Sequence, residues 1–218
     1  PNHLHIPRGT CTHPIFILFN EYRKIPSSIN LEQMKVGDSF PHNVVFKYIP
    51  IINDEPPLAC RQPILFKFDQ QLAKAIGNIS IVAVPGAFTP TCTENHIPPF
   101  LHGLLELLKQ QGISQVVILS ANDPFVLSAW GKLLLQQAGD SVDDSLFEDN
   151  RLVFALDPNA EFGQKNGLLV DALANGMGIR TQRFAMVVGK DRKVKYLGVE
   201  KVRGVSVSGY DAVIKAKL

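Results

Sequence analysis

The fold of this chain is constrained most by short, uniformly apolar runs that alternate with segments of helical character. Residues 79–84 and 114–121 are the two clearest runs, and the first of them stops at Pro85. Strands that are apolar on both faces are typical of a parallel sheet covered by helices. Helices are expected over about residues 90–110 and 123–137, and Pro in the first turn of the second costs no hydrogen bond. The alternation predicts an α/β fold.

An antiparallel pair is expected nearer the carboxyl end. Residues 184–188 and 193–198 are β-rich and flank Gly-Lys-Asp-Arg at 189–192, which is a good hairpin signal. Further strands are predicted at about 44–52 and 63–68. Parallel and antiparallel pairs together predict a mixed central sheet flanked by helices.

The first 33 residues differ from the rest, because no helical or alternating period runs through them. A chain of 218 residues is expected to hold one large domain or two small ones. We expect a single folded domain at 34–218, which opens on Met34, and a leader at 1–33 that is disordered or not native. The leader residues His3, His5, Cys11 and His13 match no structural zinc spacing, and no metal is expected.

Charge and cysteine content exclude several classes of protein. Lys and Arg number 22 and Asp and Glu 20, so the net charge of +2 falls short of a nucleic-acid-binding footprint. No apolar stretch approaches the roughly 20 residues that a membrane-spanning helix needs. Three cysteines are too few for a disulfide scaffold. They leave a reduced compartment, a reactive thiol or a bridge between chains.

The most informative segment is the P-x-x-x-T-x-x-C pattern formed by Pro85, Thr89 and Cys92. A buried strand ends there, a turn follows, and Cys92 is expected in the first turn of a helix. Free N–H groups and the positive end of the helix dipole then favour thiolate over thiol. The alternative is a buried, inert cysteine, since cysteine packs well in cores.

This pattern resembles the signature of the peroxiredoxins, which are redoxin-type, thiol-dependent peroxidases. The longer run around it looks like the type-5 subfamily, which includes fungal alkyl hydroperoxide reductases and peroxisomal membrane-associated members. Further matches follow in the same order along the chain: His96-Ile97-Pro98, Asn122-Asp123-Pro124-Phe125 with Trp130, Asp157-Pro158, and residues 183–188. The resemblance covers about residues 34–218 and implies a thioredoxin-like fold with Cys92 as the peroxidatic cysteine.

The resemblance also implies an active-site arginine at Arg183. In a strand Arg183 shares one face with Ala185 and Val187. Arg180 is expected to be a surface residue, and His96 is assigned to packing rather than to a catalytic base. The implied chemistry is attack of the Cys92 thiolate on a peroxide oxygen, with sulfenic acid as the product. Arg183, Thr89 and backbone N–H groups then stabilise the leaving oxygen. Pro85 shields the sulfur, and no metal, flavin or haem is required.

The thiol that resolves the sulfenic acid is less strongly indicated. Cys60 lies in a polar, proline-bearing loop, and such loops are typically exposed. Fungal members that resemble this chain carry a resolving cysteine in the corresponding loop, which acts on the partner subunit of a homodimer. The alternative is a one-cysteine cycle with glutathione or another small thiol. Thioredoxin or glutathione is the expected reductant.

Two further features of the sequence bear on the shape of a helix and on the location of the protein. Pro98-Pro99 stand where the family has Pro-Gly, which predicts a bent helix. The last residues, Ala216-Lys217-Leu218, resemble a peroxisomal address with Ala in place of Ser, and the alternative location is the cytoplasm.

The rival function is a peroxide sensor, a redox relay or a chaperone-like protein. A thioredoxin-type reductase is disfavoured, since Thr89 stands where a second cysteine would complete C-x-x-C.

Overall fold

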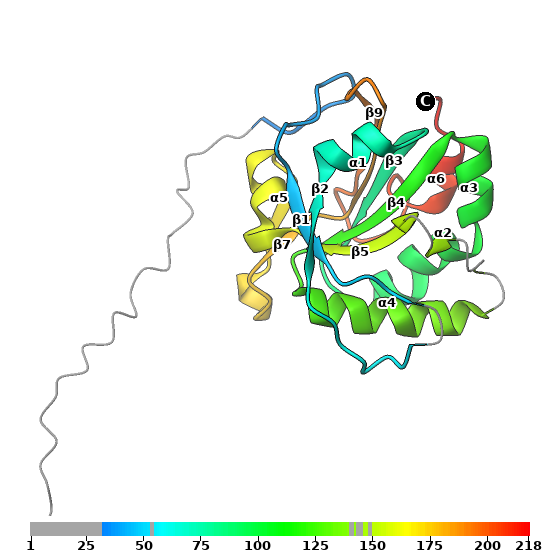
Figure 1. Ribbon diagram of the computed structural model, residues 1–218. Coiled ribbons are helices and arrows are strands. Elements are labelled where there is room, and N and C mark those ends of the chain that lie inside the picture. Colours follow the sequence, from blue (N-terminus) through cyan, green and yellow to red (C-terminus); the bar gives the residue numbers. More distant parts are fainter. Residues whose placement is uncertain (1–31, 53–54, 140–141, 143–145, 148–149) are drawn as a thin grey trace, which may run out of the picture. The chain divides into compact units, whose positions relative to one another are not determined.

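Seven strands form one mixed sheet, in the order β2-β1-β5-β4-β3-β8-β9, in the computed structural model of the chain (Figure 1). β3, β4 and β5 run parallel at its centre, and every other neighbouring pair is antiparallel. The predicted mixed sheet is therefore confirmed. The strands are β1 (Val45–Tyr48), β2 (Ile64–Lys67), β3 (Asn78–Ala83), β4 (Ile113–Ser120), β5 (Leu152–Leu156), β8 (Phe184–Val188) and β9 (Val194–Val199).

The structure describes residues 32–52, 55–139, 142, 146–147 and 150–218. The expected leader at 1–33, with its histidines and Cys11, lies outside the described residues apart from its last two positions.

Helical segments connect the strands, and a small hairpin stands apart from the main sheet. The α-helices are α1 (Phe68–Lys74), α2 (Ile97–His102), α3 (Leu104–Gln110), α4 (Pro124–Ala138), α5 (Glu161–Lys165) and α6 (Tyr210–Ile214). The π-helical segment is η1 (Thr91–His96), and the 3-10 turns are η5 (Pro158–Ala160) and η6 (Leu173–Asn175). The hairpin pairs β6 (Leu169–Asp171) with β7 (Ile179–Thr181).

The sheet separates two apolar cores, because alternate residues of each strand point to opposite faces. In β8, Ala185 and Val187 belong to the core under α2, α3, α4 and α6, whereas Phe184 and Met186 belong to the core under α1 and α5 (Figure 1). Helices thus cover both faces, which explains why the central strands are predominantly apolar and buried.

The predicted helix at 90–110 is divided into η1, α2 and α3 rather than simply bent. Pro98 and Pro99 lie in the first turn of α2, where their missing N–H groups are tolerated. The division between α2 and α3 falls at Gly103 instead. A Cβ there would lie 2.3 Å from the Tyr210 ring of α6, so glycine permits that close approach.

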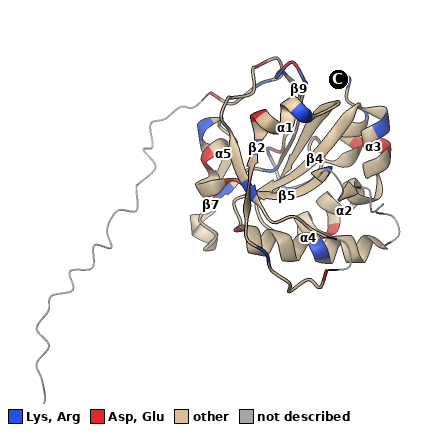
Figure 2. Cartoon of the chain, viewed as in Figure 1, with Lys and Arg blue, Asp and Glu red and all other residues tan. Residues whose placement is uncertain are grey.

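Acidic and basic residues share the surface of the described elements, as on α3 and α5 (Figure 2). Within the described part of the chain, none of the helices combines the length and the apolar character required to span a membrane.

Candidate active site

Cys92 lies in the first turn of η1, directly after the turn that ends β3. Its side chain is fully buried, in the core cluster that also contains Val84, Ala87 and Trp130. The N–H of Ile97 donates to the Cys92 carbonyl, five residues back, as a π-helix requires. Such π-turns are rare and occur frequently at functional sites. The structure therefore places the thiol at the start of an irregular helix and away from solvent.

The turn before Cys92 holds the other residues of the P-x-x-x-T-x-x-C pattern. Pro85 is partly buried at its start, and the Thr89 hydroxyl donates to the Gly86 carbonyl at 2.9 Å. Phe88 has a φ of 59°, a left-handed conformation that is uncommon for a bulky residue. The Thr89 proton is thus engaged, and its oxygen remains able to accept a hydrogen bond.

Residues after β4 brace this turn and η1. The Asn122 side-chain oxygen accepts the N–H of Ala87 at 2.9 Å. Asp123 caps α4 by accepting the N–H groups of its first turn. Further along α4, the Trp130 indole donates to the Thr93 hydroxyl at 3.2 Å. The segment at 122–130, which carries part of the family resemblance, therefore supports the Cys92 turn.

Arg183 is joined to the Cys92 helix through a buried histidine. It lies at a bend just before β8, and its Nη1 donates to His96 Nδ1 at 3.0 Å. The other ring nitrogen of His96, Nε2, lies 2.9 Å from the Ser208 carbonyl. A guanidinium only donates and a carbonyl only accepts, so both partners require the neutral tautomer with its proton on Nε2. His96 thus fixes the Arg183 side chain relative to η1.

Burial is the main cause that lowers the pKa of His96 to about 4, and the nearby Arg183 charge lowers it further. The Ser208 carbonyl opposes these effects. The imidazole is therefore neutral at pH 7, as its acceptor role toward Arg183 demands.

His96 should make the folded state sensitive to mild acid. Between about pH 6.5 and pH 4 the unfolded chain binds a proton at His96 that the folded chain does not, so stability falls as pH falls. We expect a loss of about 2 kcal/mol between about pH 7 and pH 5 from this residue. Denaturant unfolding of His96→Asn across that range should show a flatter pH dependence than wild type. His102→Asn, at an exposed site on α2, is the matched control and should keep the wild-type slope. An unchanged slope for His96→Asn would contradict the assignment.

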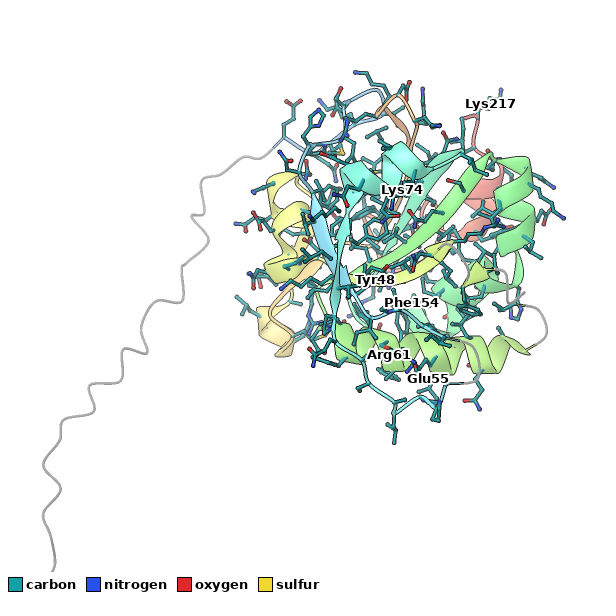
Figure 3. The ribbon with its side chains drawn as sticks, in the orientation of Figure 1. Tyr48, Glu55, Arg61, Lys74, Phe154 and Lys217 are labelled. Atoms are coloured by element: carbon teal, nitrogen blue, oxygen red, sulfur yellow. The ribbon has the colours of Figure 1, made fainter. Side chains whose placement is uncertain are left out.

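Cys60 lies elsewhere, in the loop between β1 and β2, where it is exposed. The residues on either side of it, Ala59 and Arg61, are both held by contacts with other residues. Lys132 of α4, which is 5 % exposed, donates to the Ala59 carbonyl at 2.6 Å and pairs with Glu55 at 2.8 Å. Arg61 pairs with the same Glu55 at 2.9 Å, and Figure 3 shows these two side chains together in the loop below α4. Cys60 and Cys92 are both free thiols.

Sequence reasoning missed the site roles of His96, Glu200 and Lys132. His96 lies four residues after Cys92, a spacing that places both in one helical segment, but nothing local indicated its bond to Arg183, 87 residues away. Glu200 gave no local signal, because its residue type alone is compatible with a solvated surface. Lys132 lies in an ordinary helical pattern and carried no signal at all.

No group of three or more His, Cys, Asp or Glu side chains suited to a metal ion occurs among the described residues. What this site offers is thiol chemistry: a buried cysteine in the helical segment η1, which also carries the neutral histidine that accepts a hydrogen bond from Arg183.

Comparisons with known proteins agree on one family. A family model described as Redoxin matches residues 35–214. Peroxiredoxin AHP1 of Chaetomium thermophilum is 41% identical over 182 residues, which cover 83% of this chain and 93% of that protein. A protein of Lipomyces kononenkoae, provisionally named a peroxisomal peroxiredoxin, is 44% identical over 180 residues, covering 82% of this chain and 98% of that protein. The crystal structure of reduced Prx3 from Vibrio vulnificus in complex with hydrogen peroxide superposes with a TM-score of 0.63 at 27% identity, and covers 84% of this chain and 97% of that one.

Proposed function

The chain belongs to the Redoxin family and is a peroxiredoxin, a thiol-dependent peroxidase, and we propose that Cys92 is the thiol that attacks the peroxide. The observation that carries this proposal is the hydrogen bond from Arg183 to His96, which lies four residues after Cys92 in the same segment η1. It holds a cation against the helical segment that contains the buried thiol. A buried, inert cysteine would need no such arrangement around it.

The first step oxidises the sulfur by two electrons. The Cys92 thiolate forms a bond to one peroxide oxygen while the O–O bond breaks, and Cys92 becomes a sulfenic acid. The second oxygen leaves as hydroxide or alkoxide and takes up a proton to give water or an alcohol. Arg183 stabilises the charge that develops on this oxygen. The Thr89 oxygen accepts a hydrogen bond from the bound peroxide, and Pro85 limits the approach of water.

Turnover distinguishes this function from a sensor or relay. With hydrogen peroxide or an alkyl hydroperoxide and an excess of reductant, a peroxidase consumes peroxide continuously. A sensor whose oxidised Cys92 is reduced only by its client, and not by thioredoxin or glutathione, stops after about one equivalent of peroxide per Cys92 when the client is absent. Continuous consumption with thioredoxin or glutathione would also identify the reductant.

The second step is condensation of the sulfenic acid with another thiol, which releases water and forms a disulfide. We assign this thiol to Cys60 of a partner subunit in a homodimer. Cys60 is exposed and Cys92 is fully buried, so η1 has to open before the two sulfurs meet. We expect the opening to occur in η1 itself, a π-helical segment of a kind that is frequent at functional sites.

A non-reducing gel tests the role of Cys60. After one equivalent of peroxide, wild type should migrate as a covalent dimer, which dithiothreitol converts to monomer. Cys60→Ser should remain monomeric and accumulate sulfenic acid, which a dimedone probe detects, because Cys92 still reacts but finds no partner. A wild-type chain that stays monomeric would contradict the bridge and favour a small thiol as the resolving group.

Peroxisomal location is the second part of the proposal. The tripeptide Ala216-Lys217-Leu218 follows α6, and Lys217 and Leu218 are exposed where a receptor can reach them (Figure 3). The name of the Lipomyces kononenkoae relative points to the same compartment. A fluorescent protein fused before residue 34 should give a punctate pattern, and deletion of the tripeptide should make it diffuse. A diffuse pattern with the tripeptide present would favour the cytoplasm.

A further inference from the structure

We propose that Glu200 is a positioning residue for peroxide reduction, which sets the place of the Arg183 guanidinium through Ser208 and His96. The inference rests on the proposed role of Arg183. It concerns a residue that follows β9 and that touches neither Cys92 nor the expected peroxide position.

The Glu200 carboxylate organises the segment at 206–208. Its Oε1 accepts the N–H groups of Ser206, Val207 and Ser208 at 2.6, 2.8 and 2.9 Å, and the Ser208 hydroxyl at 2.9 Å. Its Oε2 accepts the Ser206 hydroxyl at 2.8 Å. Burial alone would raise the pKa of Glu200, but these hydrogen bonds lower it to about 2. The carboxylate is therefore charged and fully used as an acceptor.

These contacts close a ring that begins and ends at Arg183. The Glu200 N–H donates to the Arg183 carbonyl at 3.0 Å, so the two main chains are paired. From the Glu200 side chain the ring runs through Ser208, whose carbonyl accepts from His96 at 2.9 Å, to the Arg183 guanidinium at 3.0 Å. Glu200 thus holds Arg183 at its main chain and, indirectly, at its charged end.

The segment at 206–208 has little freedom of its own. The Tyr196 hydroxyl donates to the Val207 carbonyl, and a Cβ at Gly198 would lie 1.9 Å from that same carbonyl. The segment therefore packs directly against β9. A shift of the carboxylate is passed on to the Ser208 carbonyl, because four of the five donors share the single acceptor Oε1. Displacements of about 1 Å in such supporting groups can lower rates about a hundredfold.

Two substitutions separate the length of the Glu200 side chain from its charge. Glu200→Gln keeps the length and the acceptor Oε1, and its amide nitrogen donates to the Ser206 hydroxyl. Glu200→Asp keeps the charge but withdraws the acceptor by one methylene. We expect Glu200→Asp to lower the rate constant of Cys92 oxidation by about tenfold and Glu200→Gln to remain near wild type. Stopped-flow fluorescence of Trp130, the single tryptophan, follows the step directly.

A double-mutant cycle tests whether the effect passes through His96. In a His96→Ala background, Glu200→Asp should cause no further fall in this rate constant, although its cost in thermal stability should persist. An equal fall in both backgrounds, or a fall with Glu200→Gln as large as with Glu200→Asp, would overturn the proposal. If Arg183→Gln fails to slow oxidation, the proposed role of Arg183 on which this inference rests is wrong. If Arg183→Gln slows it while Glu200→Asp does not, only the role of Glu200 is lost.

Discussion

Cys92→Ser is expected to abolish peroxide turnover, with a fall of at least about a thousandfold. Serine has nearly the size of cysteine, but its hydroxyl remains protonated at neutral pH and is a far weaker nucleophile toward peroxide. The small change in volume should leave the fold intact, while a hydroxyl buried in this apolar cluster should lower the free energy of unfolding. Peroxide consumption with an excess of dithiothreitol measures the loss, and circular dichroism checks the fold.

Cys60→Ser is the matched control for this prediction, since it also replaces a thiol by a hydroxyl. With dithiothreitol present to reduce the sulfenic acid, Cys60→Ser should retain turnover, because Cys60 is not required for attack on the peroxide. Wild-type turnover by Cys92→Ser, with the fold preserved, would show that another group carries the reaction.

Arg183→Gln is expected to lower the rate constant of Cys92 oxidation by about 10²–10³. Glutamine retains an amide donor, but it is shorter and lacks the positive charge that stabilises the leaving oxygen. The loss should therefore appear in the reaction with peroxide, whereas the disulfide-forming step should keep its rate. Stopped-flow measurements at several peroxide concentrations separate the two steps.

Arg180→Gln provides the comparison for this effect. Arg180 lies in β7, three residues before Arg183, and its Nε donates to the Met177 carbonyl at 2.6 Å. The same substitution there should leave the rate within a small factor of wild type. A larger effect at Arg180 than at Arg183 would mean that the family resemblance assigned the active-site arginine to the wrong position.

Local patterns in the sequence predicted the α/β class and the mixed sheet, and the family resemblance added the thioredoxin-like fold. The predominantly apolar runs at 79–84 and 114–121 correspond to β3 and β4, and the Gly-Lys-Asp-Arg signal corresponds to the β8–β9 turn. The division of the helix after Cys92 was not predicted, since it depends on Tyr210 packing against Gly103 across the fold. Helix breaks of this kind arise from tertiary contacts that no local pattern contains.

The candidate site was predictable only where its residues form a motif. The positions of Pro85, Thr89, Cys92 and Arg183 come from short patterns and from family resemblance, and their roles stay predictions that the variants above test. His96 and Glu200 join the site through contacts with residues far away in sequence, such as the pairing of His96 with Ser208 over 112 residues. Their residue types alone were compatible with packing and with a solvated surface.

The buried Lys132 makes the loop that carries Cys60 inseparable from α4. Its ammonium group is bound by the Glu55 carboxylate and the Ala59 carbonyl of that loop. Loss of Glu55 would leave the Lys132 charge buried without its acidic partner, which destabilises the fold. A loop grafted here from a relative would therefore need an acidic residue to meet Lys132, or a helix in which the lysine has been replaced by an apolar residue. The loop that carries Cys60 and the helix α4 therefore have to change together, both in evolution and in protein design.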